Sequence, residues 1–422
     1  MKRSCILLFI LVGTGVLTGW ASGGQEKGVG LGAITEQVQI DFWYSIGATQ
    51  AAPLEKILRD WNASNPMISV TGIYQGGYAA THDKLLTAWV AGNPPIMSQI
   101  DQCFAGVFVN NGAVLSLEGF IKGDKSFDLK DFNPYILKGG TYHGEIYGLP
   151  LNISTPILYI NRDLFRRAGL NPDKNLDTWE QAYAYSAKMT DPSSSIYGFR
   201  LYSSDWIYHS LLKQFGSDLF SPDDKKAIFN NKEGKEAVAF WKKMCDEKVA
   251  TYQAGSAANA MDFNGQIGMV VRSTGSLQAY KDNAKIDYGT LPFTFGKHKA
   301  VSLGGANIYL FGKSTPQKQR AAWEVLKFMT NTENLVHFAV NTGYMAARKS
   351  ALASPELQKI LTADPRYRTT YDQLVYSFPA PKVSSFSQID DIFHSALDRI
   401  LLKGESVDIL DEAAAKVQGL LD

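Results

Sequence analysis

Residues 38–73 read VQIDFWYSIGATQAAPLEKILRDWNASNPMISVTGI, and this stretch decides the fold class. Its first five residues alternate apolar and polar side chains, as a half-buried strand does. The apolar residues that then share one face of a helix are Leu54, Ile57, Leu58 and Trp61. The run Asn65-Pro66 ends that helix, and residues 68–73 return to strand alternation. A strand, a helix and a second strand predict a βαβ unit, and therefore an α/β protein with mostly parallel strands.

The same patterns continue beyond this unit and then begin again in a second block. The further predicted strands cover residues 96–100, 156–160, 267–271, 288–293 and 308–311, and the further predicted helices lie near residues 82–90, 237–244 and 410–421. A run with glycine and proline at residues 147–152 interrupts the rhythm between the two blocks. We therefore expect two α/β domains, each with its own core.

The chain is expected to cross between these domains more than once. The first crossing is predicted at residues 147–152, and a second where the apolar strand ending at residue 311 returns to the first block. The expected division is a signal peptide at 1–21, a flexible lead-in at 22–36, a first lobe of 37–148 plus 303–345, and a second lobe of 149–302 plus 346–422.

Composition limits the function classes. The chain has 422 residues, of which 45% are hydrophobic and 20% charged, with 42 Lys and Arg against 41 Asp and Glu. This composition disfavours a disordered chain, and the charge balance disfavours nucleic acid as a partner, because nucleic-acid binding rests on excess positive charge. The 8 Trp and 20 Tyr residues provide large faces with polar edges, which suit recognition of a small amphipathic ligand.

The N-terminus has the parts of a secretory signal. Met1-Lys2-Arg3 precedes an apolar run from Cys5 to Leu17, and small residues follow it up to a cleavage site predicted after Ala21. An uncleaved anchor is the alternative. Cys5 precedes the cleavage site, so the leader has no lipobox cysteine. We expect an exported, periplasmic protein without a membrane span in the mature chain.

Common catalytic and cofactor motifs are absent from the sequence. It contains no G-x-G-x-x-G after a strand, no phosphate-binding P-loop, no H-E-x-x-H and no G-x-S-x-G. Three cysteines are too few for a disulfide framework and lack the spacing of a zinc site. Cys103 and Cys245 fall in different predicted lobes, and we expect both to be free and buried, with an interlobe disulfide as the alternative. No cofactor and no metal are expected.

Several short runs occur in the order that is typical of one known family. They are Trp61-Asn62-Ala63-Ser64-Asn65-Pro66, Gly92-Asn93-Pro94-Pro95, Tyr159-Ile160-Asn161-Arg162-Asp163-Leu164-Phe165, Ala168-Gly169-Leu170, Thr178-Trp179 and Thr342-Gly343-Tyr344. Through this ordered set the chain resembles the family 1 extracellular solute-binding proteins of ABC importers. Within that family it is most similar to the periplasmic glycerol-3-phosphate-binding component, through the runs at residues 152–156, 273–277 and 304–306.

The resemblance implies a fold, a site and partners. The fold would be the two-lobe, type II periplasmic-binding-protein fold, with the ligand in the cleft between the lobes. The partners would be a small carbohydrate, polyol or glycerophosphate and the permease subunits of an ABC importer. The protein would act as a monomer, bind no nucleic acid and catalyse no covalent reaction.

The resemblance also implies ligand-binding residues. The positions that keep the residue type expected from the glycerol-3-phosphate binder are Tyr78, Ser154, Ser273, Gly305 and Tyr344. Two positions depart, since Gln102 replaces a glutamate and Asp390 replaces an arginine. A carboxylate in place of a bidentate cation disfavours a phosphomonoester, whereas Asp and Gln suit the hydroxyls of a neutral sugar. If the alignment slips, Lys382 or Arg399 takes the place of the arginine.

Aromatic residues give further candidates for the site. Trp179 follows Thr178 at the predicted start of a helix, where its ring could form a stacking floor for a sugar. Weaker candidates near strand ends or loops are Trp43, Tyr44, Asp101 and Trp206. The tryptophans within helical apolar stripes, Trp61, Trp241 and Trp323, are expected in the core.

The sequence therefore predicts a receptor that closes two lobes on a carbohydrate or related polyol. Binding of glycerol-3-phosphate or a glycerophosphodiester by the same fold is the alternative. An exported glycoside hydrolase is a rival from another class, and its two carboxylates would come from Asp101, Asp205 and Asp390. A surface adhesin or sensor that kept the fold is a third interpretation.

Overall fold

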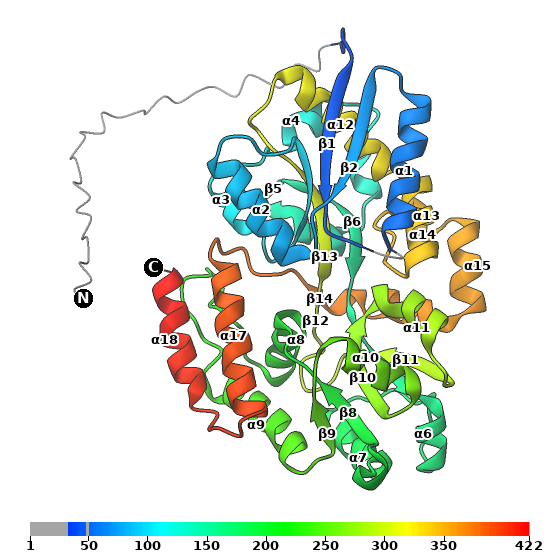
Figure 1. Cartoon of the computed structure of the whole chain (residues 1–422), viewed down its shortest axis with the longest axis vertical. Helices are drawn as coiled ribbons and strands as arrows, with labels where there is room; N and C mark the ends of the chain where they lie inside the picture. Colours follow the sequence, from blue (N-terminus) through cyan, green and yellow to red (C-terminus); the bar gives the residue numbers. More distant parts are fainter. Residues whose placement is uncertain (1–32, 48–49, 422) are drawn as a thin grey trace, which may run out of the picture.

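The computed structural model describes residues 33–47 and 50–421, which form two α/β lobes stacked along the long axis of the molecule (Figure 1). Each lobe is built around one five-stranded sheet. The expected signal peptide at 1–21, and the lead-in up to residue 32, lie outside the described residues.

The first lobe, or N-lobe, contains a mixed sheet. Its strands, in spatial order, are β2 (Ile68–Tyr74), β1 (Val38–Tyr44), β3 (Met97–Asp101), β13 (Gly304–Leu310) and β6 (Gly148–Ser154). Strand β1 pairs in parallel with β2 and β3, whereas β13 is antiparallel to β3 and to β6. Because β13 enters this sheet at the cleft, it runs away from the cleft while β3 and β6 run toward it.

Helices cover both faces of the N-lobe sheet. They are α1 (Ala51–Ser64), α2 (Tyr78–Val90), α3 (Gly106–Asn110), α4 (Glu118–Gly123), α5 (Pro134–Leu137), α12 (Pro316–Met329), α13 (Thr332–Thr342), α14 (Lys349–Leu352) and α15 (Pro355–Ala363). A two-stranded sheet of β4 (Thr141–Tyr142) and β5 (Glu145–Ile146) lies beside them. In α1 the four predicted apolar residues are all buried, which confirms the expected βαβ unit.

The second lobe, or C-lobe, repeats this arrangement. Its sheet has the order β11 (Tyr288–Pro292), β7 (Pro156–Asn161), β10 (Ile267–Ser273), β8 (Tyr197–Leu201) and β9 (Ala250–Tyr252). Strand β8 is parallel to β9 and β10, whereas β7 is antiparallel to β10 and β11. Half of the strand pairs are therefore antiparallel, which corrects the expectation of mostly parallel sheets.

The C-lobe helices surround this second sheet. They are α6 (Arg162–Arg167), α7 (Trp179–Met189), α8 (Asp205–Phe215), α9 (Lys232–Asp246), α10 (Gly255–Asn264), α11 (Leu277–Asn283), α17 (Phe386–Leu401) and α18 (Ile409–Leu421). The short α16 (Thr369–Asp372) contacts β7 and β11. The expected terminal helix is confirmed as α18, which packs against α17 (Figure 1).

The chain crosses between the lobes at positions that differ from the expected boundaries. Strand β6 belongs to the N-lobe sheet and β7 to the C-lobe sheet, so the first crossing lies at Thr155 rather than after Gly148. Pro150 does not end the strand, because the ladder with β13 shifts register beside it. Residues 346–361 remain in the N-lobe core, and only the later part of the C-terminal segment enters the C-lobe. The chain crosses between the lobes at two further segments. These contain the short strands β12 (Val301–Ser302) and β14 (Ser377–Phe378), which pair with each other in parallel.

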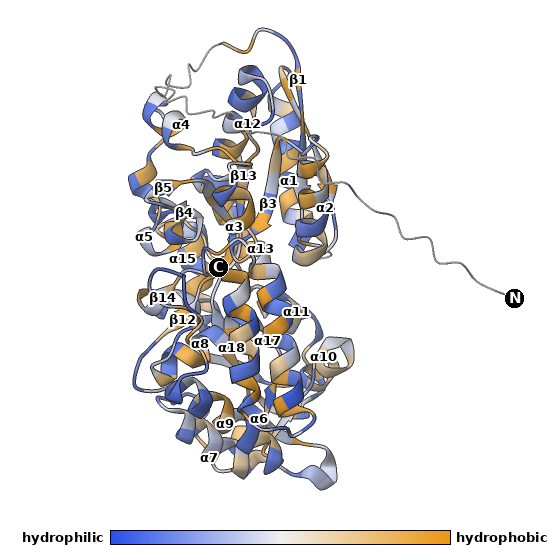
Figure 2. Ribbon diagram, turned by 90° about the vertical axis from the view of Figure 1, so that its left-hand side faces the viewer, coloured by the Kyte–Doolittle hydropathy of each residue, from blue (hydrophilic) through white to orange (hydrophobic). Residues whose placement is uncertain are grey.

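Each lobe has its own apolar core, as the sequence predicts. Figure 2 shows hydrophobic residues along the strands and hydrophilic residues on the outer faces of the helices. The three tryptophans expected in the core, Trp61, Trp241 and Trp323, are buried. Among residues 33–47 and 50–421, no helix is both long and apolar enough to cross a lipid bilayer.

Candidate functional site

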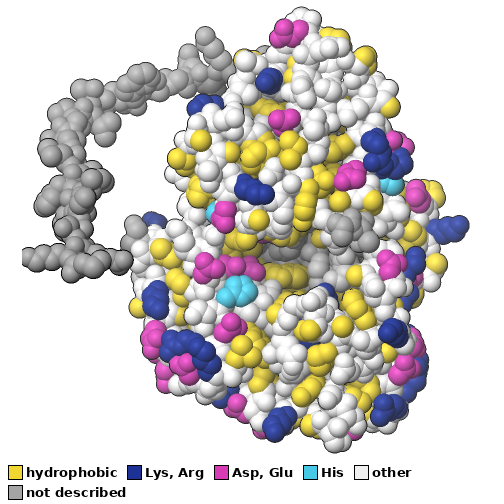
Figure 3. Space-filling model, viewed as in Figure 1, with side chains coloured by type: hydrophobic (Ala, Val, Ile, Leu, Met, Phe, Trp, Pro, Cys, Tyr) yellow, Lys and Arg dark blue, Asp and Glu magenta, His cyan; other side chains and the backbone are white. Residues whose placement is uncertain are grey.

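A cavity of about 340 Å³ lies between the two lobes. This volume is at the lower end of the range of small-molecule sites, about 300–1,000 Å³. Figure 3 shows the hollow between the lobes, with acidic side chains and a histidine at its left end. The residues that line the cavity are Tyr78, Asp101, Cys103, Phe104, Ser154, Tyr202, Ser203, Ser204, Asp205, Trp206, Ser273, Leu303, Gly304, Gly305, Tyr344 and His394.

Strand ends bring most of these residues together. Asp101 ends β3, Ser154 ends β6 and Ser273 ends β10, while residues 202–206 directly follow β8. In open α/β sheets the ligand site lies outside the carboxyl ends of the strands, because polar side chains and helix N-termini meet there. The cavity therefore occupies the position at which this fold concentrates polar groups from both lobes.

A buried chain of hydrogen bonds fixes Tyr78 at the first turn of α2. The Asn152 amide donates from Nδ2 to the Tyr78 hydroxyl (2.6 Å), and its Oδ1 accepts from Gln99 Nε2 (2.6 Å). Gln99 Oε1 in turn accepts from the backbone N–H of Ser45 (2.7 Å). Because Gln99 and Asn152 are fully buried, this chain holds the tyrosine in one position against the cavity.

Tyr344 and Ser273 both lie beside Gly275 in the cavity lining. Tyr344 follows α13 and stacks on Phe338, and its ring lies so close to Gly275 that a Cβ there would be 2.7 Å from it. Ser273 Oγ accepts from the backbone N–H of Gly275 (3.1 Å), and the Ser273 carbonyl accepts from the Tyr159 hydroxyl (2.9 Å). The Ser273 side chain is therefore a helix cap as well as part of the cavity lining.

The glycine pair at the start of β13 forms another wall. Gln102 donates from its backbone N–H to the Gly305 carbonyl and from Nε2 to the Gly304 carbonyl. Each donor–acceptor distance is 3.2 Å. Gly305 has a left-handed φ of +87°, and a Cβ built there would lie 1.8 Å from the Asn152 carbonyl oxygen. Only glycine fits this position without moving the neighbouring strand.

Gly305→Ala is therefore expected to lower the free energy of unfolding by about 2–4 kcal/mol, the sum of left-handed strain and overpacking. Urea unfolding with far-UV circular dichroism would measure the change. Gly404→Ala is the matched control, since Gly404 has a φ of +72° with nothing within 4 Å of its Cβ position. The control is expected to cost about 1–2 kcal/mol. Equal costs at the two positions would contradict the close packing against Asn152.

Helix α8 places Trp206 over the cavity. The Trp206 carbonyl accepts from the hydroxyls of Ser210 (3.0 Å) and Ser302 (2.7 Å), which tie the first turn of α8 to the hinge strand β12. The half-buried indole lies against Gly304, where a Cβ would be 3.2 Å from the ring. One face of the indole is therefore fixed by the N-lobe glycines.

The electrostatics of the cavity are acidic. Burial raises the pKa of Asp101 to about 7, and the nearby Asp205 carboxylate adds to the shift. Burial also raises the pKa of Asp205 to about 6, with repulsion from Asp390 as the next cause. A hydrogen bond to Asp390 raises the pKa of His394, whose Nε2 lies 3.2 Å from Asp390 Oδ1. Among the described residues that line the cavity there is no Lys or Arg.

Seven of the twelve predicted ligand residues line the cavity. They are Tyr78, Asp101, Ser154, Trp206, Ser273, Gly305 and Tyr344. Gln102 is buried beneath Gly304 and Gly305, and Asp390 lies behind His394, so these two act on the cavity only through their neighbours.

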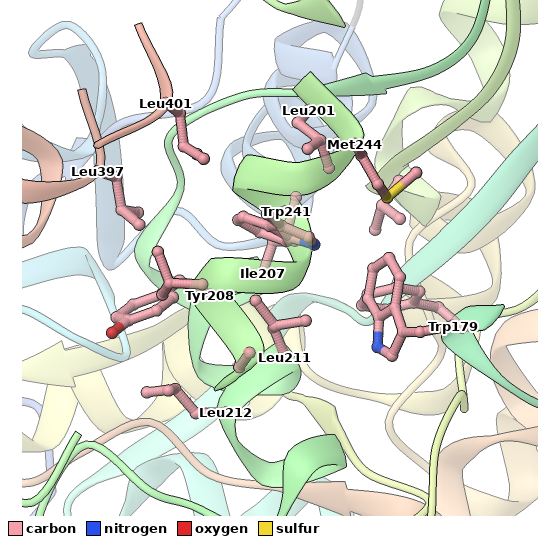
Figure 4. Packing of buried hydrophobic residues seen from close by; sticks show 14 of the residues in the cluster. Trp179, Leu201, Ile207, Tyr208, Leu211, Leu212, Trp241, Met244, Leu397 and Leu401 are labelled. Atoms are coloured by element: carbon pink, nitrogen blue, oxygen red, sulfur yellow. The ribbon is translucent and has the colours of Figure 1, made fainter. Parts of the chain in front are cut away.

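Three aromatic predictions are corrected by the structure. The Trp179 indole lies in the C-lobe core with 1% exposure, because α7 turns that face toward the sheet, and it cannot be a stacking floor (Figure 4). Tyr44 is buried and donates to Glu55 Oε1 (2.9 Å). Trp43 packs half-buried against an N-lobe apolar cluster. Neither Tyr44 nor Trp43 lines the cavity.

The alternative cations also lie outside the cavity lining. Lys382 donates to the carbonyls of Lys138 and Gly139, and Arg399 pairs with Glu405 and Glu412. Cys103 and Cys245 are both free, as expected, with Cys103 buried and Cys245 half-buried. Within the described ranges, no three His, Cys, Asp or Glu side chains gather as a metal ion would require.

Sequence reasoning missed part of the lining, chiefly Phe104, Tyr202, Ser203, Ser204 and His394. A signal for three of these residues, Tyr202, Ser203 and Ser204, was present. The polar run Tyr202-Ser203-Ser204-Asp205-Trp206 lies between a buried strand and a helix start, which is the position where α/β folds bind ligands. His394 gave no such signal, because it lies on a helix far along the chain from every other lining residue.

Comparisons with known proteins agree on one family. The model of the family described as "bacterial extracellular solute-binding protein" matches residues 56–369. The sn-glycerol-3-phosphate-binding periplasmic protein UgpB of Shigella flexneri is 25% identical over 364 residues, which is 81% of this chain and 82% of that protein.

Solved structures show the same fold. An ABC substrate-binding protein of Listeria monocytogenes in complex with cycloalternan superposes with a TM-score of 0.83 and 21% identity, covering 91% of this chain and 99% of that one. UgpB of Mycobacterium tuberculosis in complex with glycerophosphocholine gives a TM-score of 0.82 and 24% identity, covering 91% and 98%. The two-lobe binding-protein fold expected from the sequence is thereby confirmed.

Proposed function

The chain belongs to the bacterial extracellular solute-binding proteins, and from this premise we propose that it delivers a carbohydrate or related polyol to the permease of an ABC importer. As a member of this family it is a receptor and not an enzyme. It binds its solute between two lobes and presents the closed form to the permease.

One observation carries the choice of a carbohydrate. The cavity lining combines serine hydroxyls, the Asp101 and Asp205 carboxyls and aromatic rings, without a Lys or Arg among its described residues. Carboxylates and serines bind sugar hydroxyls, and tyrosine and tryptophan faces pack against the apolar C–H surface of a sugar ring. Phosphate recognition normally uses Arg or Lys, so the lining disfavours a phosphomonoester.

Glycerol-3-phosphate or a glycerophosphodiester remains the second candidate. It is supported by the similarity to relatives named for glycerol-3-phosphate and to the structure with glycerophosphocholine. Backbone N–H groups near Ser273 and His394 would have to neutralise the phosphate, because the nearest guanidinium candidate, Arg272, donates to Asn259 and Asp262 instead.

The mechanism is a shift between open and closed lobes. In the structure Gln50 Nε2 donates to the Gly275 carbonyl (2.8 Å) and Cys103 Sγ donates to Asp205 Oδ2 (3.3 Å), and each contact joins the N-lobe to the C-lobe. A solute held by Tyr78 on one lobe and Trp206 on the other adds to these contacts only when the lobes are closed.

We also propose that the mature protein is a periplasmic monomer that is exported by residues 1–21 and binds no nucleic acid. The near equality of 42 basic and 41 acidic residues supports the last point. The arrangement of Asp101 and Asp205 in one cavity resembles what a glycoside hydrolase needs, but membership of the receptor family argues against hydrolysis.

The test is a panel of ligands with the purified mature protein. A thermal-shift screen of mono- and oligosaccharides, polyols, glycerol-3-phosphate and glycerophosphodiesters would be followed by calorimetric titration, because a ligand selective for the folded state raises the melting temperature. A neutral or amino sugar is expected to raise it. A shift with glycerophosphates alone would overturn the carbohydrate proposal in favour of the second candidate.

Trp206→Ala is expected to weaken solute binding by about 10- to 100-fold, because buried aromatic anchors dominate small contact areas. The melting temperature of the free protein should change little, since the indole is only half-buried. Trp43→Ala removes a half-buried indole outside the cavity and is the matched control, with unchanged affinity expected. An unchanged affinity in Trp206→Ala would exclude this cavity as the binding site.

A further inference from the structure

Two carboxyl groups from opposite lobes meet at Cys103. The backbone N–H of Cys103 donates to Asp101 Oδ1 (2.9 Å), and its thiol donates to Asp205 Oδ2 (3.3 Å). Asp101 ends strand β3 of the N-lobe, and Asp205 begins helix α8 of the C-lobe. Both carboxyls line the cavity, so closing the lobes brings like charges to one end of the site.

Among the described residues, His394 acts on Asp205 electrostatically, but it shares its charge with Asp390. His394 is the basic residue of the lining, and it bonds to Asp390 and to Ser203 Oγ. Lys382 donates to backbone carbonyls of the N-lobe, and Arg272 pairs with Asp262. One histidine beside three carboxyls leaves Asp101 and Asp205 without a full counter-charge, so a cationic group in the cavity would be favoured.

A second observation points independently to a ligand. Ser154 is 3% exposed and Ser204 is 8% exposed, and both line the cavity. In the described part of the chain neither hydroxyl has a hydrogen-bond partner, and Ser204 does not cap the helix that follows it. Their hydroxyl oxygens are open to the cavity, so they are available to the hydroxyls of a solute.

We propose that the cavity selects a hydroxylated solute that carries a protonated amino group, such as an amino sugar or an amino polyol. Asp101 and Asp205 receive the ammonium from opposite lobes, and Ser154 and Ser204 bond to the hydroxyls. The inference rests on the proposed carbohydrate function and narrows its substrate class. A positively charged nitrogen between two carboxylates forms charge-assisted hydrogen bonds that a neutral sugar lacks.

The expected pH dependence follows from the groups around the two carboxyls. Asp205 and Asp390 lie near Asp101, as do the hydroxyls of Tyr78, Tyr142, Tyr309 and Tyr344. Tyr202 and His394 lie near Asp205. Lys382 lies near Cys103, which contacts both carboxyls. The raised pKa of Asp101, about 7, and of Asp205, about 6, make both carboxyls neutral in mild acid. Protonation removes the ammonium's partners, so amine affinity falls as the pH falls through that window. His394 and Lys382 also gain protons as the pH falls, and their added positive charge likewise lowers the affinity for an amine.

The experiment compares matched pairs that differ in one nitrogen. Calorimetric titration would use glucosamine with glucose, galactosamine with galactose, and 1-amino-1-deoxysorbitol with sorbitol. At about pH 7.5 the best amine is expected to bind at least about 10-fold more tightly than its neutral partner. At about pH 5 the difference is expected to shrink to about 2-fold or less.

Asp101→Asn separates charge from shape, because the amide oxygen can still accept from the Cys103 N–H. The variant is expected to lose the amine preference, so that the amine and the neutral member of a pair bind it equally. Asp391→Asn is the matched control, since Asp391 is exposed on the same helix as Asp390 and does not line the cavity. Its amine preference is expected to match that of the parent protein.

The possible outcomes distinguish this inference from the proposed function. Equal affinity within every pair, or tighter binding of the neutral members, overturns the amine inference and leaves the carbohydrate function in place. An amine preference that survives in Asp101→Asn also overturns it. Binding of glycerophosphates with no binding by any member of the pairs overturns both.

Discussion

Trp179→Ala is expected to lower the free energy of unfolding by about 3–5 kcal/mol, as full truncation of a buried tryptophan does. The indole is 1% exposed and contacts five other aromatic rings, those of Phe199, Phe240, Trp241, Phe293 and Phe295. Its Nε1 donates to Gln214 Oε1 (2.9 Å), and Gln214 Nε2 donates to the carbonyls of Phe293 and Ala300. Truncation therefore leaves both a void and an unpaired buried acceptor.

Urea unfolding would measure this loss, with far-UV circular dichroism as the signal because it does not depend on tryptophan fluorescence. Solute affinity of the folded fraction is expected to stay within about 2-fold, because Trp179 does not line the cavity. Trp179→Phe keeps an aromatic ring and should cost less than the alanine variant. A loss of affinity without a loss of stability would instead restore the stacking role expected from the sequence.

Asp262→Ala is expected to destabilise the C-lobe by about 3–5 kcal/mol, because it leaves the buried Arg200 and the partly buried Arg272 without their carboxylate partner. Asp262 and Arg200 are each 2% exposed, and the carboxylate accepts from Arg200 Nε (2.8 Å) and Nη2 (2.5 Å) and from Arg272 Nη1 (2.8 Å). Arg200 also lies over the ring of Tyr202, a cavity residue. The loss should therefore extend to the cavity.

Thermal melts of the alanine and asparagine variants would test this prediction. Asp262→Asn preserves the side-chain shape, so a similar cost identifies the charge as the cause. Asp246→Ala is the matched surface control, because Asp246 pairs with Lys242 one helical turn away and is largely exposed. It is expected to cost about 0.5 kcal/mol or less. A cost below about 1 kcal/mol for Asp262→Ala would contradict a strong buried network.

Local sequence patterns were sufficient for the fold class and for most elements. The helix face of Leu54, Ile57, Leu58 and Trp61 is buried as its spacing predicts, since periodicity directly reflects which face meets a core. The lobe boundary was less predictable. Gly148 and Pro150 suggest a break, but the strand continues through them because β13 supplies a shifted partner. Such a partner lies about 150 residues away and leaves no local signal.

Part of the site was predictable through the resemblance to a known family. Tyr78, Ser154 and Ser273 were predicted in this way, and each lies at a strand or helix terminus and lines the cavity. Whether a tryptophan ring lies in the core or in the cavity was not predictable, because a residue at the start of a helix can point its side chain either way. Trp179 and Trp206 both lie at the first turn of a helix, yet one belongs to the core and the other to the cavity.

The sequence by itself determined the α/β class, the two cores and the kinship to solute-binding receptors, because these depend on periodicity and on ordered runs along the chain. Only the tertiary structure decided which carboxyls share the cavity and which cations are absent from it. Asp101 and Asp205 are 104 residues apart, and Asp205 and His394 are 189 residues apart. They meet only because two sheets point their strand ends at one cleft. Charge balance at a site depends on distance in space, and distance along the chain does not determine it.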